Sequence, residues 1–218
     1  MSRPLLFASL LACALATSSS LASEAVPRSV GQPYAAGNLA DRIVLTPGQN
    51  AATQMAVSFR TDVQQSDAVL EFGPALGGPQ VTAKATQLAG STRRLDSDNG
   101  PSNYHQVRLE QLTPDTAYVY RVKGSAGWSE WQQFHTAQEH FAPFTFLYLG
   151  DAQNNILSVA SRTIRQALRS VARPALVVHA GDLVASREEL AHDDEWGEWN
   201  QAGGWAYAAI PQVAAAGN

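Results

Sequence analysis

The apolar and polar positions of the chain follow two different patterns. From about residue 40 to residue 137, short runs rich in Val, Leu, Tyr and Phe alternate with turn-forming residues, which is typical of an all-β domain. After residue 143, apolar runs are separated by stretches with apolar residues at helical spacing, which is typical of alternating strands and helices. Phe141-Ala142-Pro143 lies between the two patterns. The sequence therefore predicts two domains that meet near Phe141.

The all-β half is expected to be a sandwich of two sheets. Turn-forming residues separate seven short strand candidates, at a spacing that suits a seven-stranded sandwich. We expect these strands at residues 42–45, 54–60, 68–72, 81–87, 106–112, 117–122 and 128–135. The run LTPDTAYVYRV at 112–122 has the pattern of a tyrosine corner, with Tyr118 as the corner residue. This half resembles a fibronectin type III domain.

The second half is expected to contain three parallel strands. Residues 144–151, 175–183 and 212–218 are apolar runs without polar alternation, as expected for strands buried on both faces. Helical spacing at 157–171 predicts one connecting helix. A capping box at Ser186-Arg187-Glu188-Glu189 predicts a second helix that starts at Arg187 and runs towards Asn200. The order strand, helix, strand, helix, strand predicts an α/β domain with right-handed crossovers.

Each of the three predicted strands ends in glycine followed by a residue with a side-chain oxygen. These residues are Asp151, Asp182 and Asn218. Because open α/β sheets hold their ligands at the carboxyl ends of parallel strands, we expect the three side chains to meet at one edge of the sheet. Carboxylate and amide oxygens are hard ligands for divalent metals. The sequence therefore predicts a metal site at this edge.

The N-terminus has the composition of an export signal. Residues 1–22 combine a positive charge at Arg3, a short apolar run and small residues before a cleavage position after Ala22, and we interpret them as a signal peptide. Residues 23–39, rich in Ser, Pro and Gly, are expected to be a linker. Leu10-Leu11-Ala12-Cys13 also resembles a bacterial lipobox, so a lipid anchor at Cys13 is a minor alternative. In either case we expect a secreted or periplasmic protein.

Composition and charge argue against several kinds of partner. The 218 residues are 45% apolar and 16% charged, with a formal net charge of −4, which is ordinary for a globular protein. The sequence has no basic patch long enough to follow a nucleic-acid backbone. Outside the signal, no apolar run approaches the ~20 residues that a membrane-spanning helix needs. Cys13 is the sole cysteine, so the mature chain can bind a metal only through oxygen and imidazole.

Several other polar residues are interpreted as structural. Asp96-Ser97-Asp98-Asn99-Gly100 resembles the start of a calcium loop, but no Glu follows at the required spacing, so we interpret it as a solvated turn. His105, His135 and His140 flank or end predicted strands and are expected at the surface. His179 lies within the buried strand at 175–183 and is expected to be a hydrogen-bonded core histidine.

The three strand-end blocks together resemble a known family. Gly150-Asp151, Gly181-Asp182 and Gly217-Asn218 are similar to the first three blocks of the calcineurin-like metallophosphoesterases. A fibronectin-like domain in front of them resembles the purple acid phosphatase branch. The resemblance implies a fibronectin type III-like sandwich at 40–137, followed at 143–218 by the start of an α/β (αββα-sandwich) metallophosphoesterase domain. It also implies two metal ions, of Fe, Mn or Zn, with Asp151 on the first, Asp182 bridging both and Asn218 on the second.

The chain departs from the pattern of this family at several positions. Ala185 stands where purple acid phosphatases have a Tyr, and Gln153 stands where the wider family has a His, so Gln153 is a further candidate metal ligand. The later histidines of the family, including one that assists the leaving group, are not among the 218 residues. We therefore expect an N-terminal fragment that has no catalytic residues beyond its metal ligands and is inactive by itself.

The function implied by the resemblance is hydrolysis of phosphate esters. In such sites a hydroxide shared by two ions about 3.5–4 Å apart attacks phosphorus in line with the leaving group. Two alternatives stay open. One is a fibronectin-like binding or adhesion module with a vestigial catalytic segment. The other is a phosphodiesterase or nucleotidase that uses the same site.

Overall fold

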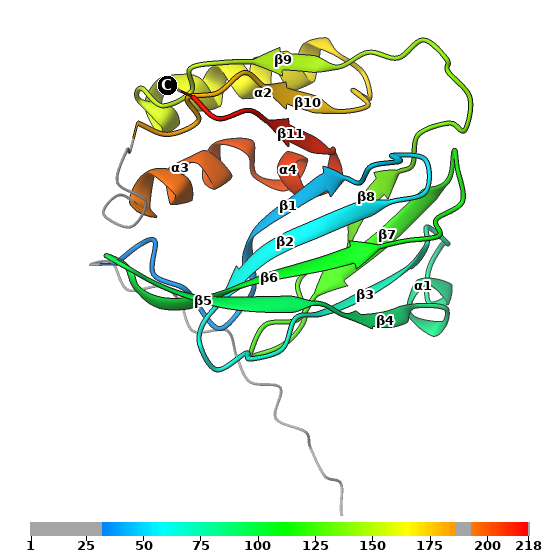
Figure 1. Cartoon of the computed structure of the whole chain (residues 1–218), viewed down its shortest axis with the longest axis horizontal. Coiled ribbons are helices and arrows are strands. Elements are labelled where there is room, and N and C mark those ends of the chain that lie inside the picture. Colours follow the sequence, from blue (N-terminus) through cyan, green and yellow to red (C-terminus); the bar gives the residue numbers. More distant parts are fainter. Residues whose placement is uncertain (1–31, 186–192, 218) are drawn as a thin grey trace, which may run out of the picture.

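The computed structural model describes residues 32–185 and 193–217, which form a β-sandwich followed by a small α/β unit (Figure 1). Several predictions lie outside the described residues. These are the signal peptide, Cys13, the first part of the linker, the helix start at Arg187 and the position of Asn218.

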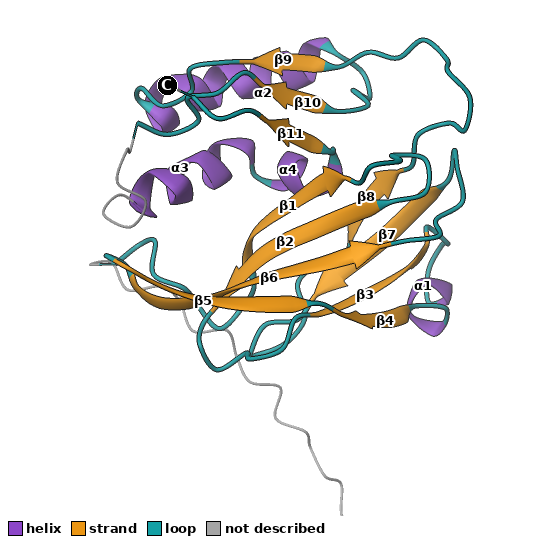
Figure 2. Cartoon of the chain, viewed as in Figure 1, coloured by secondary structure: helices purple, strands orange, loops and turns teal. Residues whose placement is uncertain are grey.

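Two antiparallel four-stranded sheets make up the sandwich (Figure 2). The first has the order β1 (Asp41–Pro47), β2 (Met55–Thr61), β6 (Gly100–Leu109), β5 (Ser91–Ser97). The second has the order β4 (Thr86–Ala89), β3 (Val69–Pro74), β7 (Ala117–Val122), β8 (Gln132–His135). A single core lies between the sheets, because alternate residues of each strand point inward. Val57 and Phe59 of β2 and Val107 and Leu109 of β6 are fully buried in this core.

The tyrosine corner is confirmed. The hydroxyl of Tyr118, near the start of β7, accepts a hydrogen bond from the backbone N–H of Thr113 at 2.9 Å. The ring of Tyr118 is stacked on that of Phe134 in β8, with centroids 5.7 Å apart. The corner therefore fixes the turn before β7 to the core, as the sequence pattern predicted.

The strand predictions were wrong in two places. The sequence predicts no strand between residues 87 and 106, but β5 and the first half of β6 form a long hairpin there, and the sandwich has eight strands in the described part. The sequence of β5, STRRLDS, shows little apolar alternation because both of its faces are largely exposed. The strand expected at 81–87 is replaced by the short helix α1 (Gln80–Ala83), which follows Pro79, and by β4.

The second unit has the predicted alternation of strands and helices. Its elements are β9 (Leu147–Leu149), the π-helical turn η1 (Ile156–Ala160), α2 (Ser161–Ser170), β10 (Val177–His179), α3 (Asp193–Gly203), α4 (Trp205–Ala209) and β11 (Gln212–Ala214). The strands form one parallel sheet with β10 in the centre. Each strand has three residues in the ladder, fewer than expected, because the chain leaves the sheet before each glycine.

The helices of the described part cover one face of this sheet. Leu147 and Val177 point towards that face and are buried against α2 and α4, together with Ala206 and Ile210. On the other face, Tyr148, Val178 and Val213 lie side by side in register across the three strands. Tyr148 is 68% exposed and Val213 is 39% exposed, so this face presents apolar surface. None of the described helices is long and apolar enough to cross a bilayer.

Candidate metal centre

Two of the predicted ligands follow neighbouring parallel strands. Asp151 comes two residues after the end of β9, and Asp182 comes three residues after the end of β10. The register pairs Leu149 with His179, and the backbone N–H of Ala180 donates to the carbonyl of Leu149 at 2.8 Å, so the two strands stay together to their carboxyl ends. Both aspartates therefore leave the sheet at the same edge, as the sequence predicted.

Both aspartates have an uncommon backbone conformation. The φ angle is +55° at Asp151 and +51° at Asp182, in the left-handed region that residues with a Cβ seldom occupy. Gly181, which precedes Asp182, has φ +102°, and a Cβ there would lie 2.8 Å from the carbonyl oxygen of Ala216. Such conformations persist where the surrounding structure holds them, and they concentrate at functional sites.

Gln153 contacts Asp182 through both its backbone and its side chain. Its backbone N–H donates to the Asp182 carbonyl at 3.1 Å, and its Nε2 donates to the Asp182 Oδ2 at 3.3 Å. Its Oε1 is buried and has no hydrogen-bond partner among the described residues. A buried amide oxygen without a donor is costly in an apolar site, but it is a suitable ligand for a hard cation. The Gln153 side chain, whose Nε2 contacts the Asp182 carboxylate, therefore offers an unpartnered oxygen of the type that a hard cation binds.

The third strand end also reaches Asp182. Gly217, the last described residue, lies so close to it that a Cβ there would be 1.7 Å from the Asp182 Oδ1. The residue after Gly217 is Asn218, whose position is outside the described part of the chain. The ends of the second and third strands therefore lie close together. The placement of the Asn218 side chain as a ligand stays a prediction.

Asp151 is exposed and borders a small cavity. The cavity has a volume of about 150 Å³, and Asn154, Thr163 and Gly181 are among its lining residues. Within residues 32–185 and 193–217, no three His, Cys, Asp or Glu side chains gather as a metal-binding group. The candidate ligands that lie in this part of the chain are therefore two carboxylates, of Asp151 and Asp182, and the amide of Gln153.

His179 is a core histidine, as expected. It is 3% exposed, its Nε2 lies 2.8 Å from the Gln212 Oε1, and its ring meets those of Trp199 and Tyr207 edge-on. Burial lowers the pKa of His179 and outweighs the opposite effect of the Gln212 hydrogen bond. The His179 ring thus connects β10 to Gln212 of β11 just before Gly181 and Asp182.

His105 was expected at the surface, and this prediction was wrong. It is 1% exposed, stacked on Phe59 with ring centroids 4.7 Å apart, and hydrogen-bonded to the hydroxyls of Thr61 and Thr92 at 2.8 and 2.9 Å. The alternation of His105 with the buried Val107 and Leu109 was the signal that could have placed it in the core.

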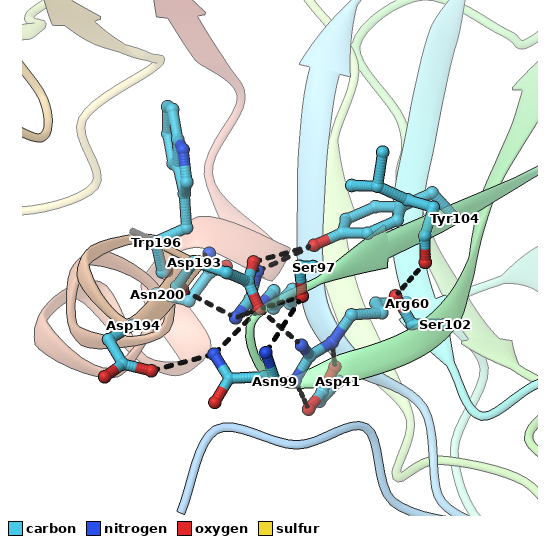
Figure 3. A network of polar contacts seen from close by, with 12 residues as sticks. Asp41, Arg60, Ser97, Asn99, Ser102, Tyr104, Asp193, Asp194, Trp196 and Asn200 are labelled. Atoms are coloured by element: carbon cyan, nitrogen blue, oxygen red, sulfur yellow. Dashed lines mark hydrogen bonds and ion pairs between the residues drawn. The ribbon is translucent and has the colours of Figure 1, made fainter. Parts of the chain in front are cut away.

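A buried ionic network between the sandwich and α3 was missed from the sequence (Figure 3). Asp193, at the start of the described part of α3, is 4% exposed and accepts hydrogen bonds from residues of the sandwich. Its carboxylate contacts the side chains of Arg42, Arg60, Ser97, Asn99 and Tyr104, all from the β1, β2 and β5–β6 hairpin region. These partners lie 89 to 151 residues away from Asp193 in the chain, so no local sequence motif predicts the contacts.

The network balances two cations with two anions. Arg60 is 1% exposed and forms a bidentate pair with Asp41, at 2.9 and 2.8 Å, besides its 3.3 Å contact with Asp193. Burial alone would raise the pKa of Asp193, but the hydrogen bond and charge of Arg42 outweigh it and hold that pKa below its ordinary value. The turn at 96–100, expected to be solvated, is therefore part of an interface, since Ser97 and Asn99 bind Asp193.

Comparisons with known proteins agree with the sandwich assignment. Residues 40–136 match the family described as "Purple acid Phosphatase, N-terminal domain", so the sandwich is a domain of this type. No curated protein matches the sequence. Among solved structures, one described as "Structure of PhoD" is similar with a TM-score of 0.54 and 15% identity, over 80% of this chain and 38% of that chain. The chicken CNTN1 FN1-FN3 domains are similar with a TM-score of 0.31 and 17% identity, over 46% of this chain and 30% of that chain.

The similarity to PhoD concerns the fold. Since it extends over 80% of the chain, it includes part of the α/β unit as well as the sandwich. The chain spans well under half the length of that structure, 38% of it.

Proposed function

We propose that this chain belongs to a metal-dependent phosphoesterase of the purple acid phosphatase type and supplies the first ligands of its metal centre. One observation supports this proposal more than the others. Two Gly-Asp strand ends leave neighbouring parallel strands at one edge, both with a left-handed aspartate, and the buried Oε1 of Gln153 has no partner in the described part of the chain.

The three residues have different parts in this proposal. Asp182 contacts Gln153 and lies against Gly217, so it is central among the strand ends and is suited to bridge two ions with its two oxygens. Asp151, exposed in the loop after β9, would hold the first ion. Gln153 would contribute its Oε1 where the family has an imidazole, and Asn218 would hold the second ion.

The metal ions would supply charge neutralisation at the phosphoryl group and a hydroxide at neutral pH. An all-oxygen donor set such as carboxylate and amide favours hard ions, and among Fe, Mn and Zn it fits Mn²⁺ best. We propose a phosphate ester as substrate and export from the cytoplasm after cleavage behind Ala22. We also propose that turnover requires the later histidines of the family, which the 218 residues do not include.

Metal binding and turnover can be tested separately. Isothermal titration of the chain with Mn²⁺ should show binding that is weakened about 10-fold or more by Asp182→Asn and clearly weakened by Gln153→Ala. A chain continued through histidine blocks of the family should release phosphate from a chromogenic ester, whereas residues 23–218 should release none above background. Phosphate release by residues 23–218 that survives Asp182→Asn would contradict the site assignment.

A further inference from the structure

The first turn of α3 is fixed to the sandwich. Asp193 receives two hydrogen bonds from the Arg42 Nη2, one to its backbone carbonyl and one to Oδ2, both at 3.0 Å. Asn99 donates to both Asp193 and Asp194, at 3.1 and 2.8 Å. Since the arginines and Asp193 are buried together, the start of α3 cannot shift without breaking a desolvated ion pair.

The same turn of α3 also holds the segment that follows Asp182. The backbone N–H of Ala185, three residues after Asp182, donates a hydrogen bond to the Glu195 Oε2 at 2.6 Å. Between them, Leu183 is buried in a cluster with Trp199, and Val184 packs against that cluster. Asp193, which binds the sandwich, and Glu195, which binds the Asp182 segment, are separated in α3 by one residue, Asp194.

The geometry points to Glu195 as a positioning residue for Asp182, with Asp193 as its anchor on the sandwich. This inference rests on the proposed metal centre and adds a role for the N-terminal domain. The left-handed backbone of Asp182 has no support from a regular ladder, because β10 ends at His179. The hydrogen bond between Ala185 and Glu195 fixes the chain on the C-terminal side of Asp182. Through α3, the sandwich therefore holds the carboxylate that the proposal assigns to both ions.

Two substitutions of Glu195 separate the loss of the acceptor from the loss of charge. Glu195→Ala removes the partner of the Ala185 N–H, whereas Glu195→Gln removes the charge but keeps an acceptor oxygen. Glu198→Ala is the matched control, since Glu198 lies on the same helix and accepts no hydrogen bond from the Asp182 segment in the described part of the chain. Each variant is measured in the 218-residue chain.

The first measurement is hydrogen exchange of the Ala185 amide in the metal-free chain. We expect exchange about tenfold faster in Glu195→Ala, and close to the unsubstituted chain in Glu195→Gln and Glu198→Ala. The second is Mn²⁺ affinity by titration calorimetry, which should fall about tenfold in Glu195→Ala and be largely restored in Glu195→Gln.

The outcomes are distinguishable. Unchanged Ala185 exchange in Glu195→Ala would overturn the hydrogen bond itself. Faster exchange with unchanged Mn²⁺ affinity would overturn the positioning role and leave the metal centre standing. An unsubstituted chain that binds no Mn²⁺ would contradict the proposed function, and the positioning role with it.

Discussion

The hydroxyl of Tyr120 donates a hydrogen bond to the backbone carbonyl of Ala208 at 2.6 Å, from the core of the sandwich to the short helix before β11. Tyr120 is fully buried, and burial raises the pKa of its hydroxyl far above the ordinary value. The hydroxyl is therefore a permanent donor at any physiological pH. This hydrogen bond between the two units is buried.

Tyr120→Phe should destabilise the chain by about 1–3 kcal/mol, because the buried carbonyl of Ala208 loses its donor and the ring is retained. Urea denaturation followed by tryptophan fluorescence measures this, since Trp199 in α3 and Trp205 in α4 lie close in sequence to Ala208. A free energy of unfolding equal to that of the unsubstituted chain would show that the joint does not depend on this hydrogen bond.

Asp193→Ala should be among the most destabilising single changes, at about 3–5 kcal/mol, because it leaves buried Arg42 and Arg60 without their shared carboxylate. Its neighbour provides the control. Asp194 is exposed and binds Asn99, so Asp194→Ala should cost about 0.5 kcal/mol or less. Equal losses in the two variants, measured by denaturant titration, would contradict the assignment of the network as a buried anchor.

Limited proteolysis should cut first near Phe141, which is 91% exposed between the two units. The sandwich at 40–137 should then resist digestion, because its core cluster consists of residues between Leu45 and Phe134 alone. The fragments can be followed by mass spectrometry. Digestion of the sandwich as fast as that of residues 143–217 would show that it does not close its own core.

Stability should fall as the solution is acidified through the histidine range. Burial lowers the pKa of His105 from its ordinary 6.5, so the unfolded chain binds a proton at a higher pH than the folded chain does. The stabilising contribution of neutral His105 is therefore complete above about pH 6.5 and is lost as the pH falls towards the folded pKa. His179, also lowered by burial, acts in the same direction.

His105→Gln should flatten this pH dependence, measured as the urea midpoint between pH 7.5 and 5. The exposed His135, changed to Gln, controls for the loss of a histidine as such. A pH dependence that is the same in His105→Gln and in the unsubstituted chain would show that another group is responsible.

Local patterns in the sequence were enough for the parts of the fold that depend on neighbouring residues. The tyrosine corner at Tyr118 and the parallel strands before Asp151 and Asp182 follow from periodicity and turn residues. The exposed β5 was missed because a strand with two solvated faces shows no alternation of apolar and polar residues. The role of Asp193 could not be predicted, since its partners in the sandwich are 89 or more residues away in the chain and meet it only after folding.

The candidate site also has features that local sequence predicts and features that only the fold determines. The strand-end positions of the aspartates were predictable, because glycine followed by aspartate after a buried run is a local signal. The contact between the Gln153 Nε2 and the Asp182 carboxylate, and the lack of a partner for the Gln153 Oε1 among the described residues, depend on how two loops meet in the folded chain, which no local pattern encodes.

Gly217 and Gly150 both end strand blocks, yet they should respond differently to an added methyl group. A Cβ at Gly150 would meet only the Cβ of Ala180, at an ordinary 3.5 Å, so Gly150→Ala should be tolerated. A Cβ at Gly217 would lie 1.7 Å from the Asp182 Oδ1 and 2.6 Å from the Asp182 backbone nitrogen. Gly217→Ala must therefore push the third strand end away from Asp182 or turn the carboxylate out of place.

We expect Gly217→Ala to weaken Mn²⁺ binding about 10-fold or more, as displacement of a ligand or its support does, while Gly150→Ala leaves the affinity within about threefold. The thermal midpoint should change little in either variant, because the end of β11 has exposed residues from Val213 to Gly217. Titration calorimetry with Mn²⁺ and a melting curve on each variant measure the two effects. If Gly217→Ala binds Mn²⁺ as tightly as Gly150→Ala does, the close approach of the third strand end to Asp182 is not needed for metal binding, and the bridge assigned to Asp182 loses its main geometric support.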